Sequence, residues 1–456
     1  MRQLPALLLA TTLGLALTGC QTQTVQKQPL KASSLVKPVQ TAAPRVIQPE
    51  ESDLWQLTRQ HLQLPLDYQH PRLESQLNWY LRHPSHMPRV TERAKPYYHH
   101  ILHEVLKRDM PAEIALLPII ESAYDPFAYS HGSAAGPWQF IPGTARHFGL
   151  RSSWWYDGRR DILASTDAAL TYLEQLHRRF DGDWLLALAA YNAGGGTVSR
   201  AMRRNREQNK PTDFWSLDLP GETKAYVPKL LAVARTVRDA DTLGITLTHI
   251  DNTPYFEAVE TGGQIDLAQA ASMAGLDLDT LYQLNPGFNR WATDPDGPHL
   301  LLVPTENAAP LRQALQTLPP EKRVNWHRYT VRPGDTLSTI AQRFNSSVSV
   351  IRQGNKLNSH LIRAGQALLV PKPSASSESY NLSLEQRIQA ERQQLEQRAK
   401  RKHYHRVDSG ESFWSIARRY GVGVRDLARW NQMAPSDTLK IGQTLLLLNV
   451  DIADAS

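Results

Sequence analysis

The C-terminal third of this 456-residue chain repeats itself, which restricts that third to copies of one small fold. Residues 329–341 return as residues 405–417 with an offset of 76, and Asn355 returns as Asn431 at the same offset. Each copy reads as a strand, a turn with glycine, two short helices and a second strand, so we predict two small βααβ domains. The predicted boundaries are 327–371 for the first copy, 372–403 for a linker with a solvated helix, and 404–449 for the second copy.

A third and weaker copy precedes these two. Gly275, Asn285 and the apolar run 300–304 follow the same outline, but residues 263–266 replace the glycine turn. We therefore predict a degenerate domain of the same kind at 251–305. It either packs on the domain before it or binds the same ligand as the other copies.

The N-terminus has the form of an export signal that ends in a single cysteine. Arg2 precedes an apolar run over residues 4–17. This run is shorter than the about 20 residues that a membrane-spanning helix needs, but its length suits a signal peptide. The run leads to Cys20, the only cysteine, so no intramolecular disulfide is possible. This arrangement resembles a bacterial lipobox, which implies that Cys20 carries a lipid. We expect a signal peptide at 1–19 and a flexible tether at 20–52.

The lipid on Cys20 is the one membrane attachment that the sequence offers. Gln21 follows it, whereas the sorting rule of such lipoproteins retains those with aspartate at this position in the inner membrane. The resemblance therefore implies a place in the cell envelope, on the periplasmic face of the outer membrane.

Composition and charge exclude several classes of protein. A hydrophobic content of 41% and a charged content of 21% are typical of globular domains and exclude a disordered chain or a membrane bundle. The net charge of +7 suits loose attraction to an acidic polymer, and without a zinc-finger or RNP motif we predict no nucleic-acid partner. His99 and His103 share a helix face, but the order His-Glu-x-x-His is absent and no third ligand is evident. We therefore predict no metal and no cofactor.

A nearly continuous apolar run over residues 111–120 ends at Glu121. A carboxyl at the end of such a run loses water, and this raises its pKa because the charged form is disfavoured. A carboxyl that stays protonated near neutrality can act as a general acid on a glycosidic oxygen. The alternative for Glu121 is a cap or an ion pair at the end of a helix.

The segments after Glu121 carry residues that suit a sugar groove. A turn of small residues at 132–136 leads to an aromatic residue beside an amide, and glycines stop the apolar helix 184–190 next to a second such pair. Flat rings stack on pyranoses, and amides bond to hydroxyl and N-acetyl groups. The residues are Ser122, Ser130, Trp138, Gln139, Tyr191, Asn192 and Tyr226.

Four motifs occur in a specific order: Glu-Ser at Glu121, Gly-x-x-Gln at Gln139, Ala-Tyr-Asn at Asn192 and Tyr-Val at Tyr226. Together they resemble the lytic transglycosylase catalytic domain of the soluble-lytic-transglycosylase type, which has a lysozyme-like fold. We place this domain at 96–244, after a helical extension at 53–95. Pro137 and Trp138 stand where soluble relatives usually carry Leu and Met, which implies a reshaped groove floor.

The C-terminal repeats resemble LysM domains, which bind glycans that contain N-acetylglucosamine. Two copies on one chain favour glycan binding over a purely structural role. The implied glycan-contacting residues are Gly334, Asp335, Thr336 and Leu337 in the first copy and Gly410, Glu411, Ser412 and Phe413 in the second. With the lipobox, the whole chain resembles the membrane-bound lytic murein transglycosylase D family. The expected fold class is α+β multidomain, with a mostly α-helical catalytic domain followed by small βααβ domains.

The resemblance implies a reaction in which one acid does two tasks. Glu121 protonates the oxygen between N-acetylmuramic acid and N-acetylglucosamine in peptidoglycan. Its carboxylate then takes a proton from the muramic acid 6-hydroxyl, which closes a 1,6-anhydro ring without water. The implied substrate-binding residues are Ser122, Ser130, Gln139, Tyr191, Asn192 and Tyr226.

Two other functions stay open at this point. A lysozyme-type hydrolase commonly uses two carboxylates, and Asp125, Asp157, Asp161 and Asp167 are candidates for the second. A peptidoglycan-binding lipoprotein that has lost catalysis is the other alternative. The intact set around Glu121 argues against it.

Overall fold

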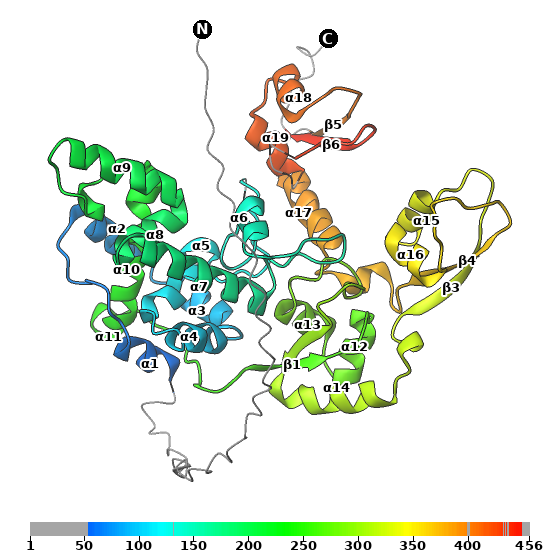
Figure 1. Cartoon of the computed structure of the whole chain (residues 1–456), viewed down its shortest axis with the longest axis horizontal. Helices are drawn as coiled ribbons and strands as arrows, with labels where there is room; N and C mark the ends of the chain where they lie inside the picture. The colour runs from blue at the N-terminus through cyan, green and yellow to red at the C-terminus, as the bar shows by residue number, and fades with distance from the viewer. Residues whose placement is uncertain are drawn as a thin grey trace, which may run out of the picture. The chain divides into compact units, whose positions relative to one another are not determined.

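The computed structural model describes residues 53–130, 132–398, 402–431, 433, 435 and 437–448. Helices dominate the first half of this part, and three two-stranded antiparallel sheets follow, each paired with short helices (Figure 1). The expected α+β class, with a mostly helical first domain followed by small βααβ domains, is thereby confirmed. Cys20 and the predicted signal peptide and tether lie outside the described residues.

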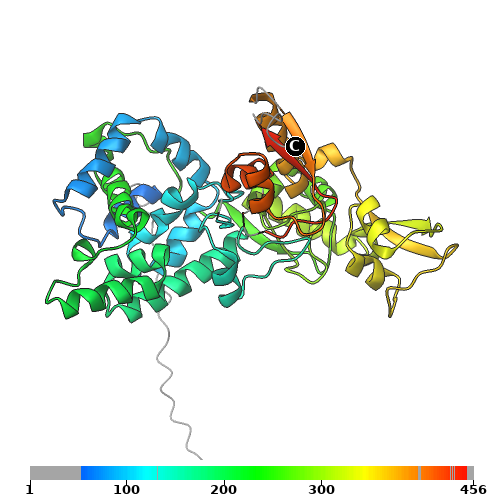
Figure 2. The same cartoon turned by 90° about the horizontal axis from the view of Figure 1, so that it is seen from above.

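The helical part, drawn blue to green in Figures 1 and 2, gathers around one hydrophobic core. Its elements are α1 (Leu54–Gln60), α2 (Pro71–Arg82), α3 (His86–Ala94), α4 (Tyr98–Leu106), the 3-10 helix η2 (Ala112–Leu116), α5 (Leu117–Ser122), α6 (Pro142–His147), α7 (Ile162–Arg179), α8 (Trp184–Ala193), α9 (Gly195–Glu207), η3 (Phe214–Ser216), α10 (Gly221–Arg238) and α11 (Ala240–Leu243). The central helix is α10, because its length is largely buried and it contacts α2, α5, α8 and η2.

Helices α1 to α3, predicted as an extension, contribute to this same core. Leu73 and Tyr80 of α2 are buried in it, and Trp55 of α1 packs against Tyr98 with ring centroids 4.5 Å apart. Glu74 on α2 accepts a charged hydrogen bond of 2.8 Å from Arg235 on α10. Residues 53–95 are therefore built into the catalytic domain.

Three small units follow the helical domain. The antiparallel strand pairs are β1 (Phe256–Glu260) with β2 (Leu300–Pro304), β3 (Asn325–Thr330) with β4 (Ala367–Lys372), and β5 (Lys402–Arg406) with β6 (Thr444–Leu448). The helices between each pair are α12 (Leu267–Ala274) and α13 (Leu278–Leu284), α15 (Leu337–Arg343) and α16 (Val348–Gly354), and α18 (Phe413–Arg419) and α19 (Val424–Trp430). Connecting elements are α14 (Thr305–Thr317), η4 (Pro320–Lys322), η5 (Ser377–Tyr380) and α17 (Leu384–Arg398).

One asparagine in each unit makes the same three hydrogen bonds. Asn285 donates to the carbonyls of Leu281 and Leu302 at 2.8 and 2.7 Å, and accepts from the Leu302 amide at 2.8 Å. Asn355 and Asn431 form the equivalent set between their helix and their second strand. The unit of β1 and β2 therefore shares the construction of the two clear repeats, although it lacks their glycine turn.

The segment between the two clear repeats differs from the solvated linker that we expected. Tyr380 is buried, and its hydroxyl lies 3.0 Å from each carboxylate oxygen of Asp266 in the first small unit. The amide of Ser374 also donates to Asp266 at 2.8 Å, and the amide of Leu384 donates to the carbonyl of Asn289 at 2.9 Å. The buried carboxylate of Asp266 needs these donors, so the segment up to the start of α17 packs on the first unit.

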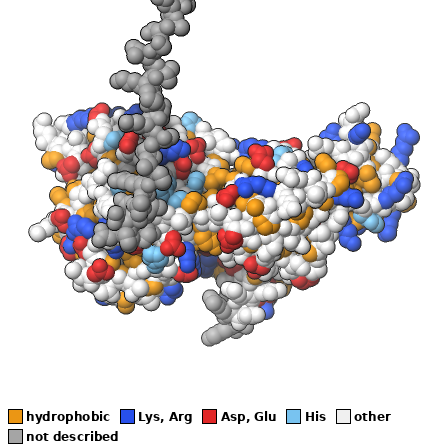
Figure 3. All heavy atoms as spheres, turned by 90° about the horizontal axis from the view of Figure 1, so that it is seen from below, with side chains coloured by type: hydrophobic (Ala, Val, Ile, Leu, Met, Phe, Trp, Pro, Cys, Tyr) orange, Lys and Arg blue, Asp and Glu red, His pale blue; other side chains and the backbone are white. Residues whose placement is uncertain are grey.

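Positive charge is concentrated in the unit of β3 and β4. Residues 325–372 contain seven Lys or Arg and one acidic residue, Asp335. Figure 3 shows Lys and Arg side chains gathered over this unit. Part of the net positive charge of the chain is therefore concentrated on one surface, which attracts anionic groups.

Candidate active site

Glu121 lies in the last turn of α5, a helix of six residues that begins after the buried 3-10 helix η2. Pro118 occupies the first turn, where the backbone N–H groups have no partner within the helix, so its missing N–H costs no hydrogen bond. Ala123 ends the helix in the left-handed conformation, with φ of 51°, and Tyr124 continues in it with φ of 56°. This sharp end leaves the half-buried Glu121 on the wall of a cavity instead of inside the core.

The cavity next to Glu121 has a volume of about 640 Å³. Three of the predicted substrate-binding residues, Ser122, Ser130 and Gln139, line it. Its other lining residues are Gln76, Trp79, His86, Ile119, Ile120, Ala123, Ala128, Tyr129 and Lys229. Among these described lining residues Glu121 is the one carboxylate, so acid chemistry in this cavity depends on it.

Burial and neighbouring donors together set the pKa of Glu121. The pKa of Glu121 is raised to about 7. Desolvation is the largest cause and raises the pKa, whereas the hydrogen bond from Tyr226 and the charge of Lys229 act to lower it. The Tyr226 hydroxyl donates to Oε1 of Glu121 at 2.5 Å. Glu121 therefore exchanges its proton near neutrality, as a group that must first give and then take a proton requires.

Backbone geometry explains the small-residue turn that precedes Gln139. Gly136 has φ of 78°, and a Cβ at this position would lie 2.0 Å from the carbonyl oxygen of Arg159. Gln139 also has a positive φ, of 49°, and its side chain donates to the carbonyl of Gly136 at 2.8 Å. The Ser122 hydroxyl lies 3.1 Å from the carbonyl of Pro137. The end of α5 and the turn are thus tied together at the cavity wall.

Tyr191 and Asn192 do not line the cavity, although both were predicted to bind substrate. The Tyr191 hydroxyl donates to the carbonyl of Trp138 at 2.9 Å, which holds the backbone beside Gln139. The Asn192 amide donates to Glu222 at 3.2 Å, and its carbonyl accepts from Thr223 at 2.7 Å. In this structure both residues position α10 and the turn.

Sequence reasoning missed the residues that α2, α3 and α10 bring to the cavity. Trp79 is 38% exposed and stacks on His83, with ring centroids 4.5 Å apart, while His86 meets its edge. Lys229 follows Tyr226 by one helical turn, and its ammonium group lies 3.4 Å from the carbonyl of Ile120. Lys229 could have been predicted, because a spacing of three residues places it on the same helix face as Tyr226. Trp79 could not, because it lies outside the catalytic motifs.

The candidate second carboxylates are held elsewhere. Asp157 binds Arg159 and Arg160, Asp161 caps α7 by accepting the amide of Ala164 at 2.8 Å, and Asp167 pairs with Arg108. Asp125 accepts the amide of Phe127 at 2.9 Å and lines a neighbouring cavity. Among the described residues that line its cavity Glu121 is the one carboxylate, and the nearby Glu222 accepts from the Asn192 amide, which argues against a two-carboxylate hydrolase.

Half of the predicted glycan-binding residues of the two repeats turn inward. Asp335 accepts from the Tyr329 hydroxyl and the Arg332 amide and pairs with Arg343, and Glu411 makes the equivalent bonds in the second repeat. Leu337 and Phe413 are 2% exposed and belong to the cores of their units. In the structure these four side chains serve their own units, because the turn needs its own acceptor and the helix needs an apolar anchor.

The glycines and hydroxyl residues of the same turns do not turn inward. Thr336 and Ser412 form capping boxes at the starts of α15 and α18 and remain exposed. Gly334 and Gly410 have φ of 86° and 82°, a backbone conformation that side chains disfavour. These four residues stay candidates for glycan contact.

Comparison with known proteins agrees with this arrangement. The family described as Transglycosylase SLT domain matches residues 103–214, the LysM-like domain of lytic transglycosylase MltD matches 255–320, and the LysM domain matches 329–371 and 405–447. The chain is 38% identical to membrane-bound lytic murein transglycosylase D of Escherichia coli K12 over 419 residues, which cover 89% of this chain and 88% of that protein. The chain belongs to this family.

Other matches are shorter or repeat the first. Membrane-bound lytic murein transglycosylase D of a second Escherichia coli strain, CFT073, gives the same 38% identity over 419 residues, with 89% and 88% of the two chains covered. The 70 kDa soluble lytic transglycosylase of Escherichia coli matches 36% of this chain and 30% of its own at 21% identity, with a TM-score of 0.28. Among the described residues of this lytic transglycosylase, none of the helices has the length and apolar character to cross a membrane.

The hydrogen bond from Tyr226 should control the pH dependence of this enzyme. If Glu121 must be protonated to act, kcat/KM is full below pH 7 and falls as pH rises through about 7. Tyr226→Phe removes a donor that stabilises the carboxylate, so the pKa of Glu121 rises and this fall moves to higher pH. We also expect kcat to drop by about 10²-fold, as for the loss of one oriented donor. Initial rates between pH 5 and 9 measure both effects. Tyr255→Phe is the matched control, and an unmoved profile in Tyr226→Phe would contradict the assignment.

Proposed function

We propose that Glu121 is the acid and then the base with which this lytic transglycosylase cleaves the β-1,4 bond between N-acetylmuramic acid and N-acetylglucosamine in peptidoglycan. The observation that carries the proposal is a single carboxyl on the wall of the cavity, with a pKa of about 7 and the Tyr226 hydroxyl bonded to it. Membership of the transglycosylase D family supports the same reaction class.

The reaction needs two proton transfers at one side chain. Protonated Glu121 gives its proton to the glycosidic oxygen, the bond to C1 of muramic acid breaks, and the N-acetylglucosamine part leaves as an alcohol. The Glu121 carboxylate, stabilised by the Tyr226 hydroxyl and the Lys229 ammonium, then takes the proton of the 6-hydroxyl as that oxygen bonds to C1. The product is a 1,6-anhydromuramoyl end. The acid is regenerated and no water is consumed.

Neighbouring residues supply the groove for the glycan. Gln139 offers an amide and Ser122 and Ser130 offer hydroxyls on the same cavity wall, which suits sugar hydroxyl and N-acetyl groups. Trp79 presents a partly exposed ring on the opposite element, α2, where it suits stacking on a pyranose. The groove therefore uses both the motif residues and the N-terminal helices.

Attachment and wall binding complete the proposal. Lipid on Cys20 anchors the chain to the periplasmic face of the outer membrane, and the LysM units hold it to the glycan. The basic surface of the unit at 325–372 favours an acidic polymer such as a wall rich in peptide carboxylates. Linked weak sites raise the local concentration of the substrate without changing the catalytic group.

Replacement of the acid separates catalysis from binding. Glu121→Gln should lower release of anhydromuropeptides by at least about 10³-fold, because an amide cannot transfer the proton, while binding to sacculi persists. The variant should also be more stable at pH 8 by about 1–3 kcal/mol. The pKa of about 7 in the folded state exceeds the ordinary 4.5, so the wild-type loses stability as pH rises from about 4.5 to about 7, and the amide does not.

Mass spectrometry of the products and thermal unfolding at pH 5 and pH 8 test these two effects together. The exposed Glu92→Gln is the matched control and should change neither. Reducing ends in place of anhydro ends from the wild-type would favour a hydrolase. Wild-type turnover by a folded Glu121→Gln protein would refute the proposal.

Trp79 tests whether the N-terminal helices form part of the groove. Trp79→Ala should raise KM for short glycans about tenfold, or ~1.4 kcal/mol, with a smaller change in kcat, and Trp79→Phe should retain part of the affinity. Trp414, which is 60% exposed in the second repeat, provides the control Trp414→Ala. Equal kinetics of Trp79→Ala and the wild-type would place the glycan elsewhere.

Cys20 tests the anchor. Cys20→Ala should either retain its signal peptide or move from the membrane fraction to the soluble fraction, since no other attachment is proposed. Immunoblots of fractions after a high-salt wash measure this. A processed Cys20→Ala protein that still sediments with membranes would contradict lipid anchoring.

A further inference from the structure

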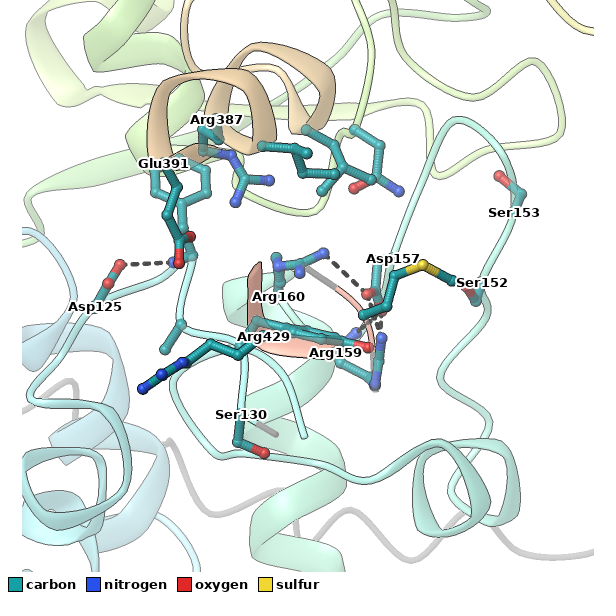
Figure 4. Close-up of a pocket in the computed structure, with 17 residues that line it drawn as sticks. Asp125, Ser130, Ser152, Ser153, Asp157, Arg159, Arg160, Arg387, Glu391 and Arg429 are labelled. Carbon is teal, nitrogen blue, oxygen red and sulfur yellow. Dashed lines mark hydrogen bonds and ion pairs between the residues drawn. The ribbon is translucent and has the colours of Figure 1, made fainter. Parts of the chain in front are cut away.

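A second cavity shares a wall with the active site. It has a volume of about 720 Å³, and Ala128, Tyr129 and Ser130 line both cavities. Figure 4 shows its other walls, which come from the segment around Asp157, from α17 and, through Arg429, from α19. A group attached to a glycan that lies beside Glu121 can therefore reach this cavity across one short loop.

Two arginines share one carboxylate on one side of this cavity. Arg159 binds both oxygens of Asp157 at 2.8 and 2.7 Å and donates to the carbonyl of Ser133. Arg160 is 3% exposed and donates to the same carboxylate at 3.0 Å, but its Nε–H is buried without an acceptor. Arg160 therefore shares the charge of Asp157 with Arg159 and keeps one buried donor without an acceptor.

A third arginine approaches from α17. Arg387 lies 4.4 Å from the ring centroid of Phe127 and donates through Nε to the carbonyl of Leu382 at 2.9 Å. One of its terminal nitrogens is buried without an acceptor. Desolvation, followed by repulsion from Arg160, lowers the pKa of Arg387 to about 9. Arg160 and Arg387, each with one buried N–H that lacks an acceptor, therefore line the same cavity.

Among the described acidic residues at the cavity, Asp157 pairs with Arg160, but none forms an ion pair with Arg387. Asp125 attracts Arg387 but hydrogen-bonds to the amide of Phe127, and Glu391 is exposed. Asn289, which is 4% exposed, also has a buried side-chain oxygen without a donor. Buried donors and an acceptor that lack partners therefore line the same space, and a ligand that carries a carboxylate and an amide group would satisfy them.

We propose that this cavity binds a carboxylate of the peptide attached to muramic acid, between Arg160 and Arg387, with Asn289 on an adjoining peptide amide. The proposal rests on the proposed function, because that function places muramic acid beside the shared wall. The peptide extends from muramic acid through its lactyl group and carries carboxylates and amides, which match the unpaired groups. Guanidinium groups suit carboxylates better than neutral sugars, because they donate two parallel hydrogen bonds.

The test compares one glycan with and without its peptides. Full-length Arg387→Met removes the charge and keeps the aliphatic stem, and Arg387→Lys keeps the charge without the fork. Substrates are uncrosslinked peptidoglycan chains and the same chains stripped of peptides by an amidase. We expect Arg387→Met to raise KM about tenfold on peptide-bearing chains only, with kcat unchanged, and Arg387→Lys to lie between it and the wild-type.

Competition by the free peptide identifies the anion. A stem peptide with a free terminal carboxylate should inhibit the wild-type more strongly than its C-terminal amide, and this difference should vanish in Arg387→Met. An equal loss on both glycans would overturn the proposal in favour of a structural role for Arg387, as would a lowered unfolding temperature with no substrate preference. Unchanged kinetics on both would overturn it as well. Failure of the proposed function is distinguishable, because Glu121→Gln would then retain activity on stripped and peptide-bearing chains alike.

Discussion

The hydrogen bond between Tyr226 and Glu121 joins the two helices on which the catalytic domain depends. Glu121 ends the short α5, and Tyr226 lies on α10, which passes through the core and contacts α2, α5 and α8. Lys229 follows one turn later on α10 and reaches the same cavity. One buried helix therefore fixes the donor and the cation around the acid. Its contact with α2 also fixes the wall that carries Trp79.

The chemical character of Glu121 could be predicted from the sequence because its neighbours along the chain are apolar. The same apolar run contains Glu113, which is fully buried and accepts the amides of Gln63 and Leu64 at 3.0 and 2.8 Å. Burial acts to raise the pKa of both carboxyls. Only the three-dimensional structure separates them, because backbone donors from a distant segment surround Glu113 whereas a cavity lies beside Glu121. The order of motifs distinguished the two residues where hydrophobicity did not.

The repeats show a similar limit. The offset of 76 residues predicted two equivalent units, and Asn355 and Asn431 make equivalent bonds in them. The direction of the turn side chains could not be predicted in the same way. A carboxylate after a glycine suits a ligand as well as it suits the turn's own amide, and Asp335 serves the turn. Tyr380 was missed for a related reason, because its partner Asp266 lies 114 positions away and only the fold brings the two together.

The distribution of carboxylates constrains which reaction this cavity can support. An inverting hydrolase needs a second carboxylate about 6.5–9.5 Å from the acid, with room for water between them, and a retaining one needs a nucleophile about 5 Å away. Here Asp157 and Asp167 are paired with arginines away from the cavity of Glu121, and Asp161 caps a helix. If the 6-hydroxyl of the substrate is the nucleophile, a second carboxylate is unnecessary. The base that deprotonates this hydroxyl is then the Glu121 carboxylate, which forms when Glu121 gives up its proton in the first step. The same desolvation that keeps Glu121 protonated before the first step then makes its carboxylate a stronger base in the second. A single half-buried carboxyl with a pKa near neutrality can therefore serve both steps of an intramolecular transfer.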